Sequence, residues 1–549
     1  MGALHLLDVF SQFYHDNPSI IITNLMFLFI KPISDILLPH LYGKVMTSME
    51  NKGNVYTPLI YVTLVMAIVQ ILYLLSHYHD SKLFPRLQCY IREQILRKIL
   101  KNYEEQYTEL ELGSIISKII KLPQVMVEWF ERMKNYVIPS VIVFIIASIY
   151  FIYQDLQLGL ALFLVLLLFT ILIIMSPLTC GKISYDRDKC FNIIHEKIDD
   201  ILRNLFSVYG TNQKEVEFKD LATFTSKHTA LFEDTVNCVL KLKFFMTPLT
   251  ILYLIFFIRR CYILMNSNKM PTSKFISIFI ILIYVLGLME SMNDEINDII
   301  VEWGIMESSS DIIMNIPKKV TDDDNKLYSI PQYGIGFHNV SFSYPDNNKM
   351  TLRNISFHIG KGEKVCITGD IGSGKSTIIK LLLKYNIANS GTIYWDGRDY
   401  KDIDILELRS KLGYVPQQPV LFNRTIIQNI LYGNSSYTRQ DVEVILKKFD
   451  ISSEFEKFDQ GLDTVIGKNG SKLSGGQRQL VWCLRVLLSN PDIIILDEPT
   501  ASIDEKTKVV LHNMLNTLMT NKTVIMVTHD PFLVDIATRT ISMKNGIIL

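Results

Sequence analysis

The stretch from Gly369 to Thr377, which reads GDIGSGKST, has residue types and a spacing suited to holding phosphate groups. An apolar run typical of a strand, 365–368, precedes it, and one typical of a buried helix, 378–383, follows it. Glycines let such a loop curl so that successive backbone N–H groups face an anion, and the helix N-terminus adds its positive end. The Lys375 ammonium could reach the β- and γ-phosphates of a nucleotide, and the Ser376 hydroxyl could ligate Mg²⁺. The predicted phosphate loop consists of Gly369, Asp370, Ile371, Gly372, Ser373, Gly374, Lys375, Ser376 and Thr377.

Two carboxylates follow a second apolar run, 493–496, which is typical of a buried parallel strand. They are Asp497 and Glu498. At the carboxyl end of a strand beside the phosphate loop, Asp497 could hold Mg²⁺ through water, and Glu498 could orient and deprotonate an attacking water. The pair therefore predicts nucleotide hydrolysis at the phosphate loop.

A second helix start suited to phosphate lies at 473–477, which reads LSGGQ and has no lysine of its own. Its residues are Ser474, Gly475, Gly476 and Gln477. If two copies pack head to tail, each nucleotide is enclosed between the phosphate loop of one copy and this helix start of the other. Tyr344 ends an alternating, strand-like run, 337–343, and it could stack on an adenine ring or pack as a core or edge residue.

The elements that carry these residues follow a long apolar region. Hydrophobic residues make up 49% of the 549 residues, charged residues make up 20%, and long apolar runs are concentrated in residues 1–300. A membrane span needs about 20 mostly apolar residues. Six spans are predicted, at 22–45, 57–78, 135–153, 157–178, 243–264 and 274–292. The formal net charge is zero, so the charge balance does not predict nucleic acid as a partner.

Lys and Arg are abundant between the second and third spans and between the fourth and fifth, and absent from the link 154–157. The positive-inside rule therefore places both long connections, and the nucleotide-binding part after them, in the cytosol. Both connections keep a helical apolar period, so we expect the spans to continue as helices beyond the membrane. Turns are expected near 103–113 and 203–210, where the membrane part would touch the nucleotide-binding part.

Several residues of the membrane part have more than one possible role. For Lys31 and Asp35, a local ion pair, a position facing a cavity and a substrate contact all stay open. Arg259 and Arg260 are expected to snorkel to the far interface. Residues 1–14 lack the features of a cleavable signal and suggest an amphipathic helix on the membrane surface. The seven scattered cysteines are expected to be buried apolar residues rather than a disulfide framework.

Taken together, these motifs resemble those of ATP-binding cassette half-transporters of the exporter type. The resemblance covers nearly the whole chain and is most specific over about 334–549. It implies an all-α transmembrane domain of six helices (1–316) with the long intracellular helices of type I exporters, a linker (317–332) and a P-loop α/β nucleotide-binding domain (333–549). It implies ATP and Mg²⁺ as cofactors.

The resemblance also assigns roles to individual residues. Tyr344 matches the aromatic residue that stacks on adenine, and Gln417 matches the glutamine that reaches Mg²⁺ and the attacking water. Asp504 matches the aspartate that contacts the opposite copy, His529 the histidine on the γ-phosphate, and Glu498 the catalytic base. Lys375, Gln417, Glu498 and His529 are thus the implied catalytic residues, and Ser376, Gln417 and Asp497 the implied metal ligands. Lys468 departs from the pattern, because exporters usually carry Glu there, and the chain ends at 549 before the family's usual acidic and helical tail, as a minimal or truncated version would.

The function implied is ATP-driven export of an unidentified substrate across a lipid bilayer by alternating access of a dimer. The partner is a second copy of the chain or a related half-transporter. An ATP-gated channel or regulatory protein of the same family is the alternative, although the presence of Glu498 and His529 counts against it. The predicted spans 135–153 and 157–178 exclude a soluble ATPase that uses the same cassette.

Overall fold

The computed structural model describes residues 2–50, 52–102, 112–267, 270–314, 334–344, 350–501 and 503–549. The chain divides into two compact units, a helical unit that contains α1 to α11 and an α/β unit that contains β1 to β10. The predicted linker, 317–332, and most of the predicted turn at 103–113 lie outside the described residues.

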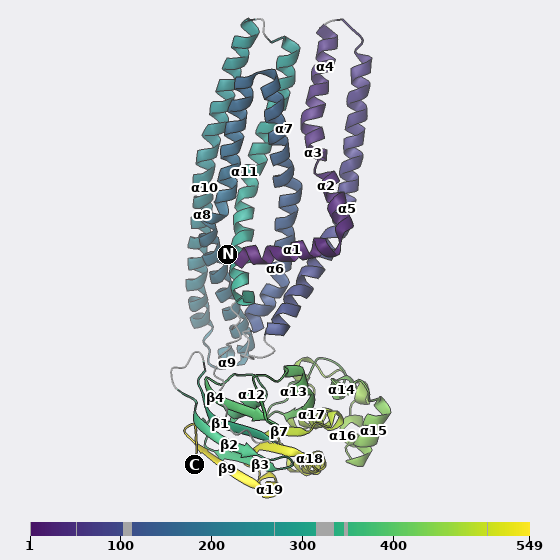
Figure 1. Ribbon diagram of the computed structural model, residues 1–549, viewed down its shortest axis with the longest axis vertical. Coiled ribbons are helices and arrows are strands. Elements are labelled where there is room, and N and C mark those ends of the chain that lie inside the picture. The colour runs from purple at the N-terminus through teal and green to yellow at the C-terminus, as the bar shows by residue number, and fades with distance from the viewer. Residues whose placement is uncertain are drawn as a thin grey trace. The chain divides into compact units, whose positions relative to one another are not determined.

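The helical unit begins with short helices and continues with long ones (Figure 1). Its elements are α1 (Gly2–Asp16), α2 (Pro18–Phe27), α3 (Ile30–Pro32), a π-helix (Ile33–Leu37), α4 (Leu38–Glu50), α5 (Tyr56–Asn102), α6 (Leu112–Arg132), a second π-helix (Met133–Val137), α7 (Ile138–Gln154), α8 (Leu156–Arg203), α9 (Leu205–Gly210), α10 (Lys214–Asn266) and α11 (Thr272–Met314).

Six helical stretches of the described residues are long and apolar enough to cross a membrane, and each contains one predicted span. The second, fourth, fifth and sixth spans lie in α5, α8, α10 and α11. The third begins in the second π-helix and continues in α7, and the first is divided among α2, α3, the first π-helix and α4. As predicted, α5 and α8 continue far beyond their spans, to Asn102 and Arg203. The second predicted turn contains α9, where Phe206 is 91% exposed.

The core of the helical unit lies where α8 packs against α7, α10 and α11. Large side chains that are fully buried there include Phe151, Phe169 and Phe257. The outer helix faces keep many apolar residues exposed, as expected for a surface that meets lipid rather than water.

The first helix, α1, runs crosswise to the long helices (Figure 1). Its apolar residues Phe10 and Phe13 are buried by protein, since the ring of Phe10 stacks on Phe130 at 5.4 Å and that of Phe13 meets Tyr90 at 5.2 Å. The helix is amphipathic as predicted, but α5 and α6 cover these two side chains, where we had expected lipid. Aromatic pairs of this kind stabilise packing beyond the area that they bury.

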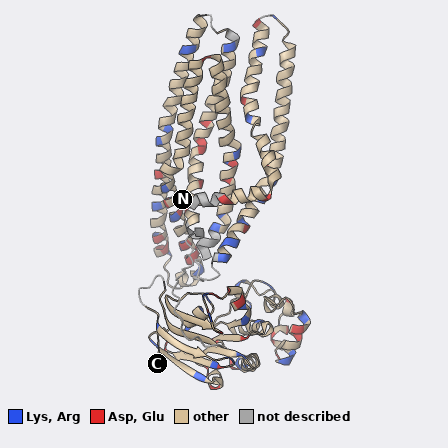
Figure 2. Ribbon diagram, viewed as in Figure 1, with Lys and Arg blue, Asp and Glu red and all other residues tan. Residues whose placement is uncertain are grey.

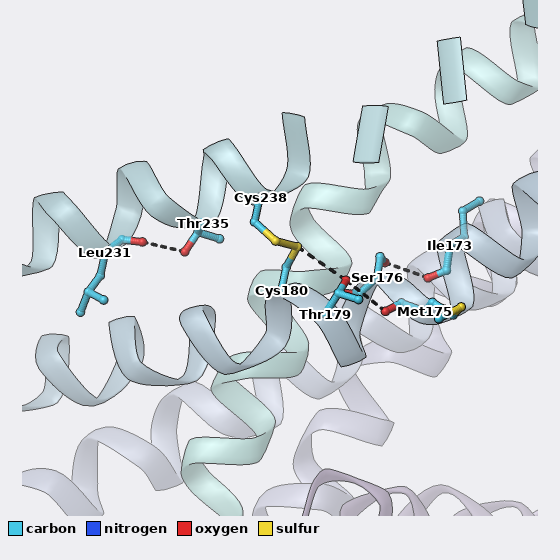
Figure 3. The surroundings of a disulfide bond; sticks show 8 residues. All are labelled: Ile173, Met175, Ser176, Thr179, Cys180, Leu231, Thr235 and Cys238. Carbon is cyan, nitrogen blue, oxygen red and sulfur yellow. Dashed lines mark hydrogen bonds between the residues drawn. A yellow bond between two sulfur atoms is a disulfide. The ribbon is translucent and has the colours of Figure 1, made fainter. Parts of the chain in front are cut away.

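A disulfide joins α8 to α10 through Cys180 and Cys238, with the Cα atoms 5.9 Å apart (Figure 3). The Thr179 hydroxyl lies beside it, 3.8 Å from the Cys180 Sγ. The expectation of buried apolar cysteines in place of disulfides was therefore wrong for this pair, because two cysteines 58 residues apart in sequence become neighbours only when the helices pack. The free thiols of Cys190, Cys261, Cys366 and Cys483 are buried as expected, and Cys89 is exposed.

Charged side chains gather toward the ends of α5 and α8 that continue beyond the spans, and are sparse along the remainder of the helices (Figure 2). At the opposite end, the Arg260 guanidinium donates to the Asp155 carboxylate at 2.8 Å, and Asp155 also accepts from the backbone N–H of Leu158. Arg260 thus ties α10 to the start of α8 instead of only snorkelling. Lys31 and Asp35 form no ion pair within 4.0 Å in the described part of the chain, and Lys31 instead lines a cavity.

The α/β unit contains two sheets with helices around them (Figure 1). Its strands are β1 (Ile335–Phe342), β2 (Leu352–Ile359), β3 (Lys364–Gly369), β4 (Ser390–Trp395), β5 (Arg398–Asp399), β6 (Leu412–Val415), β7 (Ile493–Asp497), β8 (Thr523–Val527), β9 (Arg539–Lys544) and β10 (Ile547–Ile548). Its α-helices are α12 (Lys375–Leu382), α13 (Ile405–Lys411), α14 (Ile426–Ile430), α15 (Arg439–Lys448), α16 (Ser452–Glu456), α17 (Gly475–Ser489), α18 (Glu505–Leu518) and α19 (Pro531–Ile536), with 3₁₀ turns at Gly461–Asp463 and Lys468–Gly470.

The larger sheet has the order β10-β9-β3-β8-β7-β6, and the strands from β9 to β6 are parallel. The smaller sheet, β2-β1-β4-β5, is antiparallel. Strands β3, β7 and β8 are central, and their nearly continuous apolar runs are buried as expected for a sheet covered on both faces. Because these strands are parallel, the phosphate loop after β3, the carboxylates after β7 and the histidine after β8 emerge at the same edge.

Candidate nucleotide-binding site

The phosphate loop connects β3 to α12 through three glycines with positive φ. A Cβ at Gly369 would lie 2.2 Å from the Met543 carbonyl oxygen, and one at Gly374 would lie 2.6 Å from a Leu352 methyl group. Both positions therefore require glycine for space as well as for conformation. The predicted strand, glycine loop and helix are all present, with Gly374 as the N-cap of α12.

Lys375 forms hydrogen bonds with the backbone of its own loop. Its buried ammonium donates to the carbonyl oxygens of Gly369, at 2.6 Å, and of Asp370, at 3.0 Å. Among the described residues no carboxylate lies within 4.0 Å of this ammonium, and Asp497 interacts with its charge from farther away. A charge held at the mouth of an anion-binding loop favours phosphate, as the sequence predicts.

Other loop residues differ in their exposure. Ser376 is exposed at the first turn of α12, and Ser373 is buried with a hydroxyl that has no hydrogen-bond partner in the described part of the chain.

Tyr344 is half-buried, packs edge-on against Phe342 at 5.0 Å and places its hydroxyl 3.3 Å from that of Thr377. Tyr344 thus packs partly as a core residue, the simpler of its two predicted roles, while its ring stays beside the loop.

The two carboxylates after β7 occupy different environments. Burial raises the pKa of Asp497, the adjacent Glu498 raises it further, and the Tyr414 hydroxyl donates to Asp497 at 3.4 Å. Glu498 has a φ of +43°, which is unusual for a residue with a side chain, and its N–H donates to the Val527 carbonyl at 2.7 Å. Such strained backbone persists where the surrounding structure fixes it, commonly at functional sites.

Gln417 and Glu498, which are 81 residues apart, are in contact. The Gln417 amide donates to the Glu498 carboxylate at 3.2 Å. The Gln417 amide oxygen, the Ser376 hydroxyl and the Asp497 carboxylate are all oxygen donors, which are the ligands that Mg²⁺ prefers. The donor set therefore fits a magnesium ion.

His529 is exposed directly after β8, and the residue beside it is held by a network that the sequence did not predict. The buried carboxylate of Asp530 accepts from the Phe532 N–H at 3.0 Å and lies 2.9 Å from the His512 Nε2. Burial alone would raise the pKa of Asp530, but hydrogen bonds from Thr500, His512 and the Phe532 N–H outweigh it and hold that pKa below its usual range. Because buried polar groups are almost always hydrogen-bonded, a carboxylate buried beside the predicted catalytic histidine indicates that hydrogen-bond donors surround it.

The LSGGQ stretch begins α17 with a complete capping box. The Ser474 hydroxyl accepts from the Gln477 N–H at 3.1 Å, and the Gln477 side chain accepts from the Ser474 N–H at 3.0 Å. No hydrogen bond in the described part of the chain joins this stretch to its own phosphate loop. Asp504 caps the next helix, α18, by accepting from the Thr507 N–H at 3.0 Å.

A cavity of about 650 Å³ brings Gln417 together with the start of α17. Gly475, Arg478 and Ala501 line it, and so does the exposed Lys468. The residue that departs from the exporter pattern thus lies beside the glutamine that reaches Glu498.

The fold and the site together define a P-loop nucleotide-binding domain joined to a six-helix membrane domain. Residues 352–501 match the model of the family described as ABC transporter. The chain is 40% identical over 210 residues to ABC transporter B family member 24, mitochondrial, of Arabidopsis thaliana, which covers 38% of this chain and 31% of that protein. It is 29% identical over 432 residues to ATP-binding cassette sub-family B member 6 of Mus musculus, covering 75% and 49%. The chain thus spans about half or less of the length of these relatives.

The solved structure of a bacterial Atm1-family ABC exporter with ATP bound superimposes with a TM-score of 0.83, at 21% identity, over 96% of this chain and 94% of that one. Residues 352–501 thus match an ABC transporter domain, and the chain as a whole has the exporter fold that the sequence predicts. The six apolar helical stretches of the described residues indicate a multi-pass membrane protein, and the matched domain implies ATP binding.

Proposed function

We propose that the chain is one half of an ATP-driven exporter and works as a dimer with two composite ATP sites. The observation that carries this proposal is that the start of α17 makes no hydrogen bond to the phosphate loop of its own chain among the described residues. Lys375 lies in the phosphate loop and Gln417 contacts Glu498, whereas Ser474 caps a helix whose start lacks such a contact with the loop. Each nucleotide would lie between the loop of one copy and α17 of the other.

The residues divide the work of hydrolysis as follows. Lys375 and the loop N–H groups bind the phosphates, and Glu498 takes a proton from the attacking water, which the Gln417 amide helps to orient. His529 donates to the γ-phosphate, Tyr344 stacks on the adenine, and Asp504 contacts the opposite copy. A Mg²⁺ ion held by Ser376, Gln417 and Asp497 would neutralise phosphate charge.

ATP closure is transmitted to the spans through the two cytosolic turns, and opening of the dimer after hydrolysis resets them. On α9, the exposed side chains of Phe206 and Tyr209 support a contact surface at the second turn. Lys468 replaces the usual acidic residue where such a surface would dock, so the charge pairing that is usual in the family is not expected there. The solved bacterial Atm1-family exporter with ATP bound has this fold, which supports an ATP-bound state as one stage of the cycle.

The test is the ATPase rate of the purified chain alone in lipid bilayers, compared with its Glu498→Gln variant. We expect a vanadate-sensitive rate with cooperative dependence on ATP, and its loss in the variant, where the base is replaced by an amide of the same shape. Nucleotide binding without any hydrolysis would contradict the homodimer. It would favour a related half-transporter as partner, or the ATP-gated channel.

A further inference from the structure

A cavity of about 280 Å³ lies in the helical unit between the α2–α3 segment, α5 and the junction of α6 with α7. Its lining mixes apolar and aromatic side chains with two basic and two acidic ones, which are Lys31, Lys134, Asp80 and Glu131. Lys31 lies inside a predicted span, where an ionisable group is costly unless it serves a function, and the other three lie just beyond the ends of the second and third predicted spans. The cavity belongs to neither the nucleotide site nor the predicted transmission turns.

The helices that line the cavity are irregular where they do so. The first span breaks between α2 and α3, at Leu28 and Phe29, and resumes through the π-helix Ile33–Leu37. The second π-helix, Met133–Val137, contributes Lys134, Asn135 and Tyr136 to the lining. Broken helices are tolerated at membrane depth where they line a cavity, and π-helical turns are frequent at functional sites.

Two of the lining residues form a buried salt bridge with each other. Asp80 and Lys134 are each 6% exposed and form a salt bridge. The Asn135 amide also donates to the Asp80 carboxylate, at 3.3 Å. Because Asp80 and Lys134 neutralise each other, this part of the lining shapes the cavity but offers no unpaired charge to a ligand.

Two further charges remain available to a ligand. The Lys31 ammonium lies 3.3 Å from the Ser140 hydroxyl and 5.7 Å from the centre of the Tyr136 ring, with no carboxylate within 4.0 Å in the described part of the chain. Glu131 is half-buried and likewise has no basic group within 4.0 Å among the residues described. One cation and one anion that form no ion pair within 4.0 Å among the described residues thus line the same cavity.

We propose that this cavity binds the zwitterionic headgroup of a phospholipid, with its phosphate on Lys31 and its ammonium on Glu131. The four charges of the lining sum to zero, which favours a zwitterion over the anionic headgroups that basic pockets bind. Exposed apolar residues flank the cavity on both lining helices, including Leu25, Met26 and Phe29 beside α2 and Ile71, Leu74 and Leu75 on α5. These surfaces provide a place for the acyl chains.

The test uses the purified full chain in detergent and native mass spectrometry with phosphatidylethanolamine and phosphatidylglycerol of identical acyl chains. Lys31→Met should weaken binding of both lipids about tenfold, as loss of one charged hydrogen bond predicts. Glu131→Gln should weaken only phosphatidylethanolamine, by a similar factor, so that the two lipids bind alike. The matched controls are Lys44→Met, on the exposed surface of α4, and Glu128→Gln, one turn before Glu131 and outside the lining.

A second measurement needs no variant. Phosphatidylethanolamine with a photoactivatable headgroup should crosslink the native chain within 27–31 or 131–139. Equal binding of the two lipids by the native chain, unchanged binding in both variants, or crosslinks confined to other segments would overturn the proposal. Competition by soluble glycerophosphoethanolamine at the same concentration as the lipid would assign the cavity to a soluble zwitterion and would equally overturn it.

Discussion

Gly476 at the start of α17 packs closely against α18, so adding a single methyl group there should lower the stability of the domain. A Cβ there would lie 2.8 Å from the Thr507 Cγ2 methyl of α18, well inside ordinary contact distance. Thr507 is β-branched and stiff, so it cannot easily turn away. Overpacking of this kind costs about 1–3 kcal/mol, and the better helix propensity of alanine offsets at most about 1 kcal/mol of it.

We therefore expect Gly476→Ala to destabilise the nucleotide-binding domain by about 1–2 kcal/mol, which lowers its Tm by about 2–8 °C for a domain of this size. The assay is thermal unfolding of the full chain, in which Mg·ATP identifies the domain's transition by shifting it upward. Gly336→Ala is the matched control, since its Cβ would meet no atom closer than 3.7 Å and should change the Tm little.

The reasoning is tested by removing the clashing methyl group. Thr507→Ser deletes Cγ2 and keeps the hydroxyl, so Gly476→Ala should cost little stability in its presence, and the double-mutant cycle should show a coupling of about 1–2 kcal/mol. The ATPase rate should recover with the stability. Additive losses would refute the clash, and recovered stability without recovered activity would place the defect at the nucleotide itself.

Three further outcomes are expected. Because burial raises the pKa of Asp497 in the folded state, its negative charge lowers the stability of the domain as pH rises above the ordinary carboxyl range. Asp497→Asn should therefore raise the domain's Tm at neutral pH but not in acid. The variant should also abolish the Mg²⁺-dependent part of the rise in Tm that ATP produces. The hydrogen bonds that lower the pKa of Asp530 stabilise the fold above the ordinary carboxyl pKa, and this stabilisation is lost as pH falls through the lowered pKa. His512→Ala should therefore destabilise the domain by about 1–3 kcal/mol at neutral pH and by less in acid. Thermal melting at several pH values would measure this difference. Denatured, unreduced chain should accept five maleimide labels and reduced chain seven, since Cys180 and Cys238 are paired; seven labels without reduction would contradict the disulfide.

Local pattern was enough to predict much of the site. The phosphate loop, the carboxylates after β7 and the helix start at Ser474 are each contiguous stretches, so their spacing carries the prediction. The six spans were predicted on the same grounds, because hydropathy is summed over neighbouring residues. The parallel order of β3, β8 and β7 then brings their carboxyl ends together.

Contacts between distant residues were not predictable in this way. The disulfide, the His512–Asp530 contact and the cavity around Lys31 all join residues from separate helices or loops. Nothing near Phe10 or Phe13 indicates that Phe130 and Tyr90 will cover them in place of lipid. An amphipathic pattern shows that a face must be buried and leaves the covering surface undetermined.

The central claim, that each ATP site is shared between two copies, is tested most directly by mixing inactive variants. Lys375→Met and Ser474→Arg should each abolish hydrolysis alone, since each breaks both sites of its own homodimer. When the two variants are co-reconstituted, a mixed dimer pairs the intact loop of one with the intact helix start of the other and restores one complete site. The account predicts renewed ATPase activity in the mixture, and a mixture as inactive as either variant alone, despite demonstrated mixed dimers, would contradict it.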